Sequence, residues 1–250
     1  MARHGHTRAT SAPGLDTVAI GKAKISMPNA HKGALPTKTV IALVRHGATP
    51  TTGKILPGRA KGLNLSPQGI QQAQMAGDTL RDFLELSSGG LRLGALYSSP
   101  MERARQTAKS IGQVLGVKPV IERDLIECDF GDWTGKTLSS LARLDKWKQI
   151  YQAPGTFRFP GGESLAELQA RITDCMSKLE QRHQGYMVIC VSHADPIKLA
   201  LCDALGAHLS TMHKIAVATA SISVVSYMNR VPTVNCINVT GSLKALERSL

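Results

Sequence analysis

Two histidines of this chain stand at the ends of predicted β-strands. The first strand is predicted over 39–44 and leads into Arg45 and His46, and the second, over 186–191, leads into His193. Each histidine is thereby placed at the carboxyl edge of a sheet, where open α/β sheets bind their ligands. An imidazole beside a fixed positive charge, with a glycine that lets the backbone approach closely, suits a phosphate better than a metal ion.

These residue types support phosphoryl transfer. The transition state spreads negative charge over the non-bridging oxygens, and the guanidinium groups of Arg45 and Arg103 could clamp those oxygens in fork geometry. His46, as a neutral imidazole, can attack phosphorus and form a phosphohistidine, and a protonated His193 would add a further positive donor. The leaving oxygen needs a proton, and Glu127, in a predicted loop, is the candidate general acid if burial keeps it protonated near neutral pH.

Each histidine taken alone has a simpler interpretation as a structural or surface residue. Two of them at equivalent strand ends, each in a turn that contains Gly or Pro, favour the catalytic interpretation. A second Arg-His-Gly at 3–5 has no strand before it and no helix after it, so we assign it no chemistry. His208 and His213 lack the Cys or carboxylate neighbours of a metal site, and we predict neither a metal ion nor a cofactor.

The elements that position these residues alternate between strand and helix along the chain. Helices are predicted over 68–86 and 101–115, each just after a Ser-Pro pair that is typical of a helix start. The alternation indicates a three-layer α/β/α sandwich with a mostly parallel central sheet. The other predicted helices are 137–149, 163–182 and 197–205, and the other predicted strands are 93–98, 117–122, 221–228 and 233–239.

Aromatic residues gather in one part of the sequence. This density predicts a small helical cap over the sheet edge, within 130–160, although a small secondary core without a ligand role explains most of these side chains equally well. The six aromatic residues concerned are Phe130, Trp133, Trp147, Tyr151, Phe157 and Phe159.

The length of 250 residues is enough for one sizeable domain with a cap, and the formal net charge is +12. Residues 1–38 carry six basic residues and one acidic residue, which accounts for +5 of that charge. We predict that 1–38 is a flexible basic N-terminal extension and that 39–250 is a single domain. The remaining +7 fits an enzyme for phosphorylated substrates, a nucleic-acid-binding protein or a solvated surface without a partner.

The five cysteines are odd in number and form no C-x-x-C pair, which indicates free thiols in a reducing compartment. We therefore predict a cytoplasmic location, while organelle targeting by residues 1–38 stays open. No apolar run approaches the roughly 20 residues of a membrane span, so we expect no membrane association.

Several short motifs occur in an order that resembles the histidine phosphatase superfamily, with its phosphoglycerate mutase-like fold. The resemblance covers about residues 39–240, and it is closest to a branch of phosphatases and phosphomutases without settled substrates. The motifs are Leu43-Val44-Arg45-His46-Gly47-x-Thr49, Gly58-Arg59, Leu65-Ser66-x-x-Gly69-x-x-Gln72-Ala73, Ser98-Ser99-Pro100-Met101-x-Arg103-Ala104-x-Gln106-Thr107-Ala108, Glu127-x-x-Phe130-Gly131-x-Trp133-x-Gly135, Pro160-Gly161-Gly162-Glu163-Ser164 and Val191-Ser192-His193.

The resemblance implies a role for individual residues. It makes His46 the phosphorylated nucleophile and Glu127 the proton donor, and it places Arg59 at the rim of a phosphate pocket. Two positions depart from the family. Thr52 stands where an Asn often contacts phosphate, and its hydroxyl could take the place of that Asn as a phosphate ligand. Asp195 brings a carboxylate near the pocket unless it points away, toward Lys198. The implied phosphate pocket consists of Arg45, Arg103 and His193.

The resulting prediction is a metal-independent, histidine-type acid phosphatase that hydrolyses a small phosphorylated metabolite through a phosphohistidine. A phosphoglycerate mutase-like phosphomutase is the first alternative, since it would use the same residues with a second hydroxyl as acceptor. A weakly catalytic basic binding protein is the second, but nucleic acid is disfavoured because the bases are dispersed and no known binding motif is present. The oligomeric state is left open, with a homodimer as one option.

Overall fold

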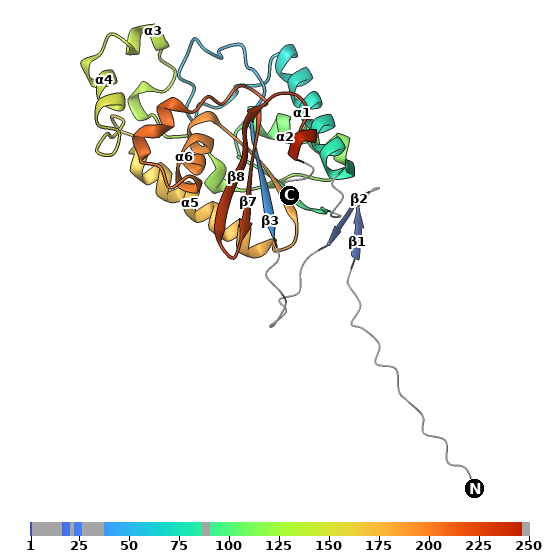
Figure 1. The fold of residues 1–250 in the computed structure, drawn as a ribbon. Helices are drawn as coiled ribbons and strands as arrows, with labels where there is room; N and C mark the ends of the chain where they lie inside the picture. The colour runs from blue at the N-terminus through green and yellow to red at the C-terminus, as the bar shows by residue number, and fades with distance from the viewer. Residues whose placement is uncertain (2–16, 21–22, 27–37, 87–90, 247–250) are drawn as a thin grey trace.

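The computed structural model describes residues 1, 17–20, 23–26, 38–86 and 91–246. Its centre is a six-stranded sheet with helices on both faces (Figure 1). The sheet has the strand order β5-β4-β6-β3-β7-β8. These strands are β3 (Thr39–Arg45), β4 (Leu93–Ser98), β5 (Val120–Ile121), β6 (Met187–Ser192), β7 (Ile222–Met228) and β8 (Val231–Val239).

The sheet is mostly parallel, as predicted. β3 pairs in parallel with β6, β6 with β4, and β4 with β5, whereas β7 is antiparallel to both of its neighbours, β3 and β8. A tight turn joins β7 to β8, and its residues Asn229 and Arg230 have positive φ angles of 51° and 66°. Positive φ at both central positions is the geometry of a hairpin turn that matches the twist of the strands.

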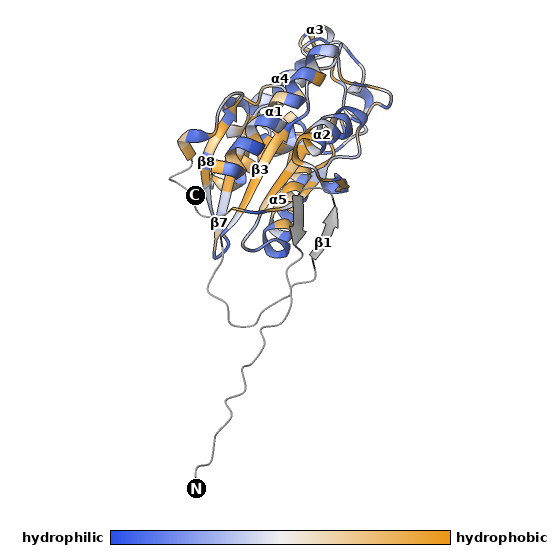
Figure 2. Cartoon of the chain, turned by 90° about the vertical axis from the view of Figure 1, so that its right-hand side faces the viewer, coloured by the Kyte–Doolittle hydropathy of each residue, from blue (hydrophilic) through white to orange (hydrophobic). Residues whose placement is uncertain are grey.

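The central strand β3 is buried on both faces, which explains its continuous apolar sequence. Val40, Ala42 and Val44 pack in the cluster that includes α1 (Pro67–Leu86) and α2 (Glu102–Leu115). Ile41 and Leu43 pack on the opposite side, with α5 (Leu165–Arg182) and α6 (Ala194–Ala204). Figure 2 shows the strands as a hydrophobic layer between α1 and α2 on one side and α5 on the other, so the predicted sandwich is confirmed.

The segment predicted as a cap extends past one end of the sheet and carries α3 (Leu138–Leu141) and α4 (Asp145–Gln152) (Figure 1). The single helix predicted over 137–149 is wrong, because Leu144 has an extended backbone, with ψ 133°, that separates the two. Four of the six aromatic side chains are buried in a cluster continuous with the α5–α6 side of the core, Trp147 packs against it partly buried, and Tyr151 is exposed. Contacts within the cluster join Phe130 to Phe159, Trp133 to Phe157 and Phe159, and Phe157 to Phe159.

Two other elements differ from the sequence prediction by three residues or more at one end. The strand predicted over 117–122 shrinks to Val120–Ile121, because Gly116 ends α2 with φ 68° and the amide of Val117 donates to the Gly112 carbonyl of that helix. The helix predicted over 197–205 begins three residues earlier, at Ala194. Pro196 fits within its first turn, where backbone N–H groups have no partner in the helix.

The N-terminal extension contains regular structure that we did not predict. Thr17–Ile20 (β1) and Ala23–Ser26 (β2) pair as an antiparallel hairpin. Four residues per strand are too few for alternation to be recognised in the sequence. Residues 2–16, which include the Arg-His-Gly at 3–5, and residues 21–22 and 27–37 lie outside the described residues, and the flexibility of the extension stays a prediction.

The loop after β3 lies directly against the start of α1. A Cβ on Gly69 would stand 2.0 Å from the carbonyl oxygen of Ala48, and one on Gly47 would stand 2.3 Å from that of Gly69. Both distances are far shorter than a Cβ tolerates, so only glycines allow this contact. Because Gly47 follows His46, the contact also sets the path of the chain just beyond the first histidine.

We predict that Gly69→Ala lowers the free energy of unfolding by about 1–3 kcal/mol, since the backbone has to move despite the better helix propensity of alanine. Urea unfolding measures the change. Gly155→Ala is the matched control, because a Cβ there meets nothing within 4 Å. Equal unfolding midpoints for the two variants would contradict the close packing described above.

Candidate active site

The two histidines meet at the carboxyl edge of the sheet. In the parallel pairing of β3 with β6, Arg45 stands opposite Ser192, and the amide of His46 donates to the Ser192 carbonyl at 3.0 Å. His46 and His193 follow directly, and their ring centroids lie 5.1 Å apart with an interplanar angle of 63°. The expectation that parallel neighbours bring both imidazoles to one edge is therefore met.

His46 is held as a neutral ring with a defined tautomer. Its Nε2 lies 3.1 Å from Nε of Arg103, and its Nδ1 lies 2.7 Å from the carbonyl oxygen of Gly47. A guanidinium can only donate, so Nε2 is the acceptor and the ring proton sits on Nδ1, where it donates to Gly47. Burial, followed by the charges of Arg103 and Arg45, lowers the pKa of His46 to about 3. The lone pair of Nε2 is thus the nucleophilic position.

Both arginines retain unused donors in this buried site. Arg103 is fully buried and donates from Nη2 to the Gly58 carbonyl at 2.8 Å, and Arg45 donates from Nη1 to the Val217 carbonyl at 2.7 Å. Among the described residues, Nη1 of Arg103 and Nε of Arg45 have no hydrogen-bond partner. Buried, unpartnered guanidinium donors are costly to a fold, and they match the oxygens of a phosphate.

His193 is also neutral, unlike the protonated donor considered from the sequence. Its ring is fully buried, and burial together with the positive charge of Arg103 lowers its pKa well below the ordinary value. Its Nε2 lies 2.7 Å from the hydroxyl of Ser99, which accepts from the amide of Met101 at 3.3 Å. We assign the hydroxyl as donor to Nε2, so the ring proton sits on Nδ1, 4.0 Å from Oε2 of Glu127.

Glu127 has the protonation behaviour of a general acid. Its carboxyl is buried, and Oε1 accepts a hydrogen bond from the amide of Cys128 at 2.9 Å. Burial raises its pKa to about 7, and the negative charge of Asp195 adds to that effect while Arg103 opposes it. A substantial fraction of Glu127 therefore carries a proton near neutral pH, which is what proton donation to a leaving oxygen requires.

Arg59 lies close to Glu127 but is engaged by other protein groups. Its Nε donates to the Glu127 carbonyl at 2.9 Å, its Nη2 donates to Oε2 of Glu163 at 3.0 Å, and its Nη1 lies 3.5 Å from Oδ2 of Asp129. All three nitrogens thus face protein oxygens. The role of phosphate ligand implied by the family resemblance would require Arg59 to leave these partners.

The two positions that depart from the family pattern are also accounted for. The hydroxyl of Thr52 accepts from the amide of Thr49 at 2.8 Å and lies 3.0 Å from the Thr49 hydroxyl, so it stabilises the turn after His46, and its contact with phosphate stays a prediction. Asp195, in the first turn of α6, lies 3.8 Å from Nζ of Lys198, as anticipated. It still stands near enough to the site to raise the pKa of Glu127.

Several residues of the site were not assigned a role from the sequence. Ser99 binds His193, and Thr107 accepts from the amide of Gly47 at 3.0 Å while it donates to the Arg103 carbonyl at 2.8 Å. Both residues belong to the sequence motif around Arg103, so the motif could have identified them as site residues. Arg171 of α5 also lies beside the site, where its Nη1 donates to the Ile126 carbonyl at 3.0 Å, and its sequence context offered no signal.

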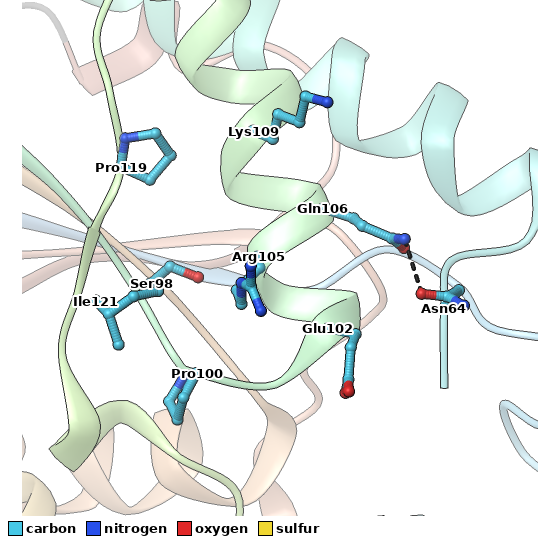
Figure 3. A pocket seen from close by; sticks show the side chains of 9 residues that line it. All are labelled: Asn64, Ser98, Pro100, Glu102, Arg105, Gln106, Lys109, Pro119 and Ile121. Atoms are coloured by element: carbon cyan, nitrogen blue, oxygen red, sulfur yellow. Dashed lines mark hydrogen bonds between the residues drawn. The ribbon is translucent and has the colours of Figure 1, made fainter. Parts of the chain in front are cut away.

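A groove of about 530 Å³ lies between α2 and the segment that carries Pro119 and Ile121, and neither His46 nor His193 lines it (Figure 3). Its polar side chains include Glu102, Arg105 and Lys109 of α2. We place the candidate active site at the strand ends instead, because the unpartnered donors and the groups with shifted pKa values converge there.

The effect of Asp195 on Glu127 can be measured directly. We predict that carboxyl NMR of labelled protein shows Glu127 titrating near pH 7, and that Asp195→Asn lowers this midpoint because a nearby negative charge is removed. Asp203→Asn, a carboxylate change in the last turn of the same helix, is the control and should leave the midpoint in place. A wild-type midpoint near 4.5, or no response to Asp195→Asn, would refute this description of the site.

The sequence of this chain is similar to those of several known proteins. The phosphoserine phosphatase 1 of Hydrogenobacter thermophilus is 29% identical over 206 residues, which cover 80% of this chain and 92% of that protein. A bifunctional protein of Mycobacterium tuberculosis is 30% identical over 217 residues, 84% of this chain, and the chain spans only 57% of its length. The protein thus matches a little over half of that relative.

Solved structures share the fold. A phosphoserine phosphatase variant of Entamoeba histolytica in complex with phosphoserine has a TM-score of 0.68 and 26% identity, over 82% of this chain and 99% of that one. The alpha-ribazole phosphatase of Shigella flexneri has a TM-score of 0.69 and 22% identity, over 81% and 98% of the two chains. The family model of the histidine phosphatase superfamily (branch 1) matches residues 41–240. The chain is a member of the histidine phosphatase superfamily.

Proposed function

We propose that this protein is a phosphomonoesterase that transfers the phosphoryl group of a small phosphorylated metabolite first to His46 and then to water. The observation that carries the proposal is the unprotonated Nε2 of His46, buried beside Arg103 and Arg45, whose guanidinium groups retain unpartnered donors. A carboxyl group with a pKa of about 7, that of Glu127, completes the set.

In the first step, the Nε2 lone pair of His46 forms a bond to phosphorus as the ester P–O bond breaks. The hydrogen bond from Arg103 to Nε2 is exchanged for one to a phosphate oxygen, and the unpartnered N–H groups of both arginines bind the charge that the transition state spreads. The hydrogen bond from Nδ1 to the Gly47 carbonyl supports the positive charge that the ring acquires. The proton of Glu127 passes to the leaving oxygen.

In the second step, water attacks the phosphohistidine. Glu127, now a carboxylate, takes a proton from that water, the P–N bond breaks, and inorganic phosphate leaves. His46 returns to its neutral tautomer and Glu127 to its protonated form. The same carboxyl thus acts as acid and then as base, a cycle suited to a group whose pKa lies near the working pH.

The comparisons support a small phosphorylated substrate. One similar protein is named a phosphoserine phosphatase, and one structure of this fold contains phosphoserine. A phosphomutase would use the same residues with a second hydroxyl in place of water, and the phosphatase names favour water as the acceptor. A binding protein without catalysis has no need for a buried acid with a raised pKa.

The cellular setting remains a prediction. All five cysteines are unpaired and four are buried, in keeping with the free thiols inferred from the sequence. Among the described helices, none combines the length and apolarity needed to cross a bilayer. The cytoplasmic location and the homodimer are predictions that only cell fractionation and solution mass can test.

We predict that His46→Ala reduces hydrolysis of an aryl phosphate by about 10³-fold or more, since the attacking atom is lost. Phosphate release in the presence of a chelator measures it. His208→Ala, which changes an exposed histidine bonded to Ser210, is the control and should retain full activity. An active His46→Ala variant would contradict the phosphohistidine mechanism. A wild type that is inactive on every phosphomonoester would favour a binding role.

Glu127→Gln should separate substrates by leaving group. An alkyl phosphate needs the proton, so we expect a loss of about 10²–10⁴-fold, whereas nitrophenyl phosphate, whose leaving group departs as an anion, should lose far less in the phosphorylation step. For the wild type, alkyl phosphate turnover should fall as the pH rises above about 7, because the protonated form of Glu127 is lost. Stopped-flow kinetics of the phosphorylation step and steady-state pH profiles measure the two effects, and equal losses for the two substrates in the phosphorylation step would argue against the acid role.

A further inference from the structure

Glu163 joins two arginines beside the loop that carries the candidate acid. Its Oε1 accepts from Nε of Arg171 at 3.0 Å, and its Oε2 accepts from Nη2 of Arg171 at 3.1 Å and from Nη2 of Arg59 at 3.0 Å. The Glu163 side chain is 13% exposed and that of Arg171 is 17% exposed. A fork-to-carboxylate pair at this depth has well-defined geometry.

The two arginines use their remaining donors to bind the loop around Glu127, residues 124–130, which we call the acid loop. Nη1 of Arg171 donates to the carbonyls of Asp124 and Ile126 at 2.6 and 3.0 Å, and Nε of Arg59 donates to the Glu127 carbonyl at 2.9 Å. The hydroxyl of Ser192 donates to the Leu125 carbonyl, which lies between those of Asp124 and Ile126, at 2.7 Å. Four consecutive carbonyls are therefore held by side chains, three of them by the two arginines.

Glu163 also binds the loop on the far side of Glu127. The amide of Asp129 donates to Oε2 of Glu163 at 3.2 Å, and the amide of Glu163 donates to the Asp129 carbonyl at 2.9 Å. The stretch from Ile126 to Phe130 lies between two short 3-10 turns, Arg123–Leu125 and Gly131–Trp133, and has no sheet or helix ladder to fix it. The backbone groups of this stretch therefore depend on the contacts with Glu163 and the two arginines.

We propose that Glu163, with Arg59 and Arg171, positions the carboxyl of Glu127 for proton transfer. None of the three touches the reacting atoms. Their function is to fix the backbone on both sides of the acid, because proton transfer requires a donor within hydrogen-bond reach of the leaving oxygen. This inference rests on the proposed function, and it gives Arg59 a role that does not involve phosphate.

The test compares two substrates on the full chain. In Glu163→Gln the carboxylate charge that pairs with both guanidiniums is lost, so we expect the phosphorylation step, followed in single turnovers, to slow by about 10-fold or more with an alkyl phosphate and to change by less than about threefold with nitrophenyl phosphate. The basic limb of the alkyl phosphate pH profile should move to lower pH, since a loosened loop admits water to Glu127. A variant that only lost folded protein would change neither the ratio of the two activities nor the pH at which the basic limb falls.

Glu167→Gln is the matched control. Glu167 lies one turn further along, pairs with the exposed Arg158 and caps the start of α5 through Ser164, and within the described part of the chain it has no hydrogen bond or ion pair to the acid loop. The glutamine can keep the capping contact, so both substrates should be turned over as by the wild type. A change in the substrate ratio of this control equal to that of Glu163→Gln would overturn the proposal.

The outcomes also distinguish failure of the positioning role of Glu163 from failure of the proposed function. If the wild type hydrolyses both substrates through His46 and Glu163→Gln loses both equally or neither, the positioning role is wrong while the proposed function stands. If the wild type hydrolyses neither substrate, the proposed function fails and the positioning role fails with it. Should Glu163→Gln not fold, Arg171→Lys, which keeps the charge without the fork, decides by the same substrate ratio.

Discussion

The parallel pairing of β3 with β6 is the constraint on which the candidate site depends. It sets Arg45 opposite Ser192, so His46 and His193 leave the sheet at the same level, with their ring centroids 5.1 Å apart. A shift of one residue would turn the side chains of β3 to the opposite face of the sheet. The neighbouring position of β4 then brings the start of α2, and with it Arg103, to the same edge.

One buried environment shifts two groups in opposite directions. Burial disfavours charge, so it lowers the pKa of His46 to about 3 and raises that of Glu127 to about 7. The result is an unprotonated nucleophile and a protonated acid at the same pH, the pairing that phosphoryl transfer to a histidine needs. The negative charge of Asp195, an outlier in the family pattern, raises the pKa of the acid further.

The sequence was sufficient for the sandwich and for the residues whose places follow from strand ends. His46, His193 and Arg103 are positioned by regular elements, and those elements carry clear periodicity and helix-start signals. The partners of Arg59 were beyond prediction, because a guanidinium on a loop chooses its acceptors by the fold of other loops, here those of Glu127 and Glu163. The same applies to the break between α3 and α4, which a single extended residue at Leu144 produces.

The covalent intermediate can be trapped where it should accumulate. With nitrophenyl phosphate, the Glu127→Gln variant can form the phosphohistidine without an acid, yet it lacks the base for the water step. After rapid quenching in alkali and proteolysis, mass spectrometry should find close to one phosphate per protein on the peptide that contains His46. Release of nitrophenol with no phosphate on the protein, or with phosphate on any other residue, would contradict the assignment of His46 as the nucleophile.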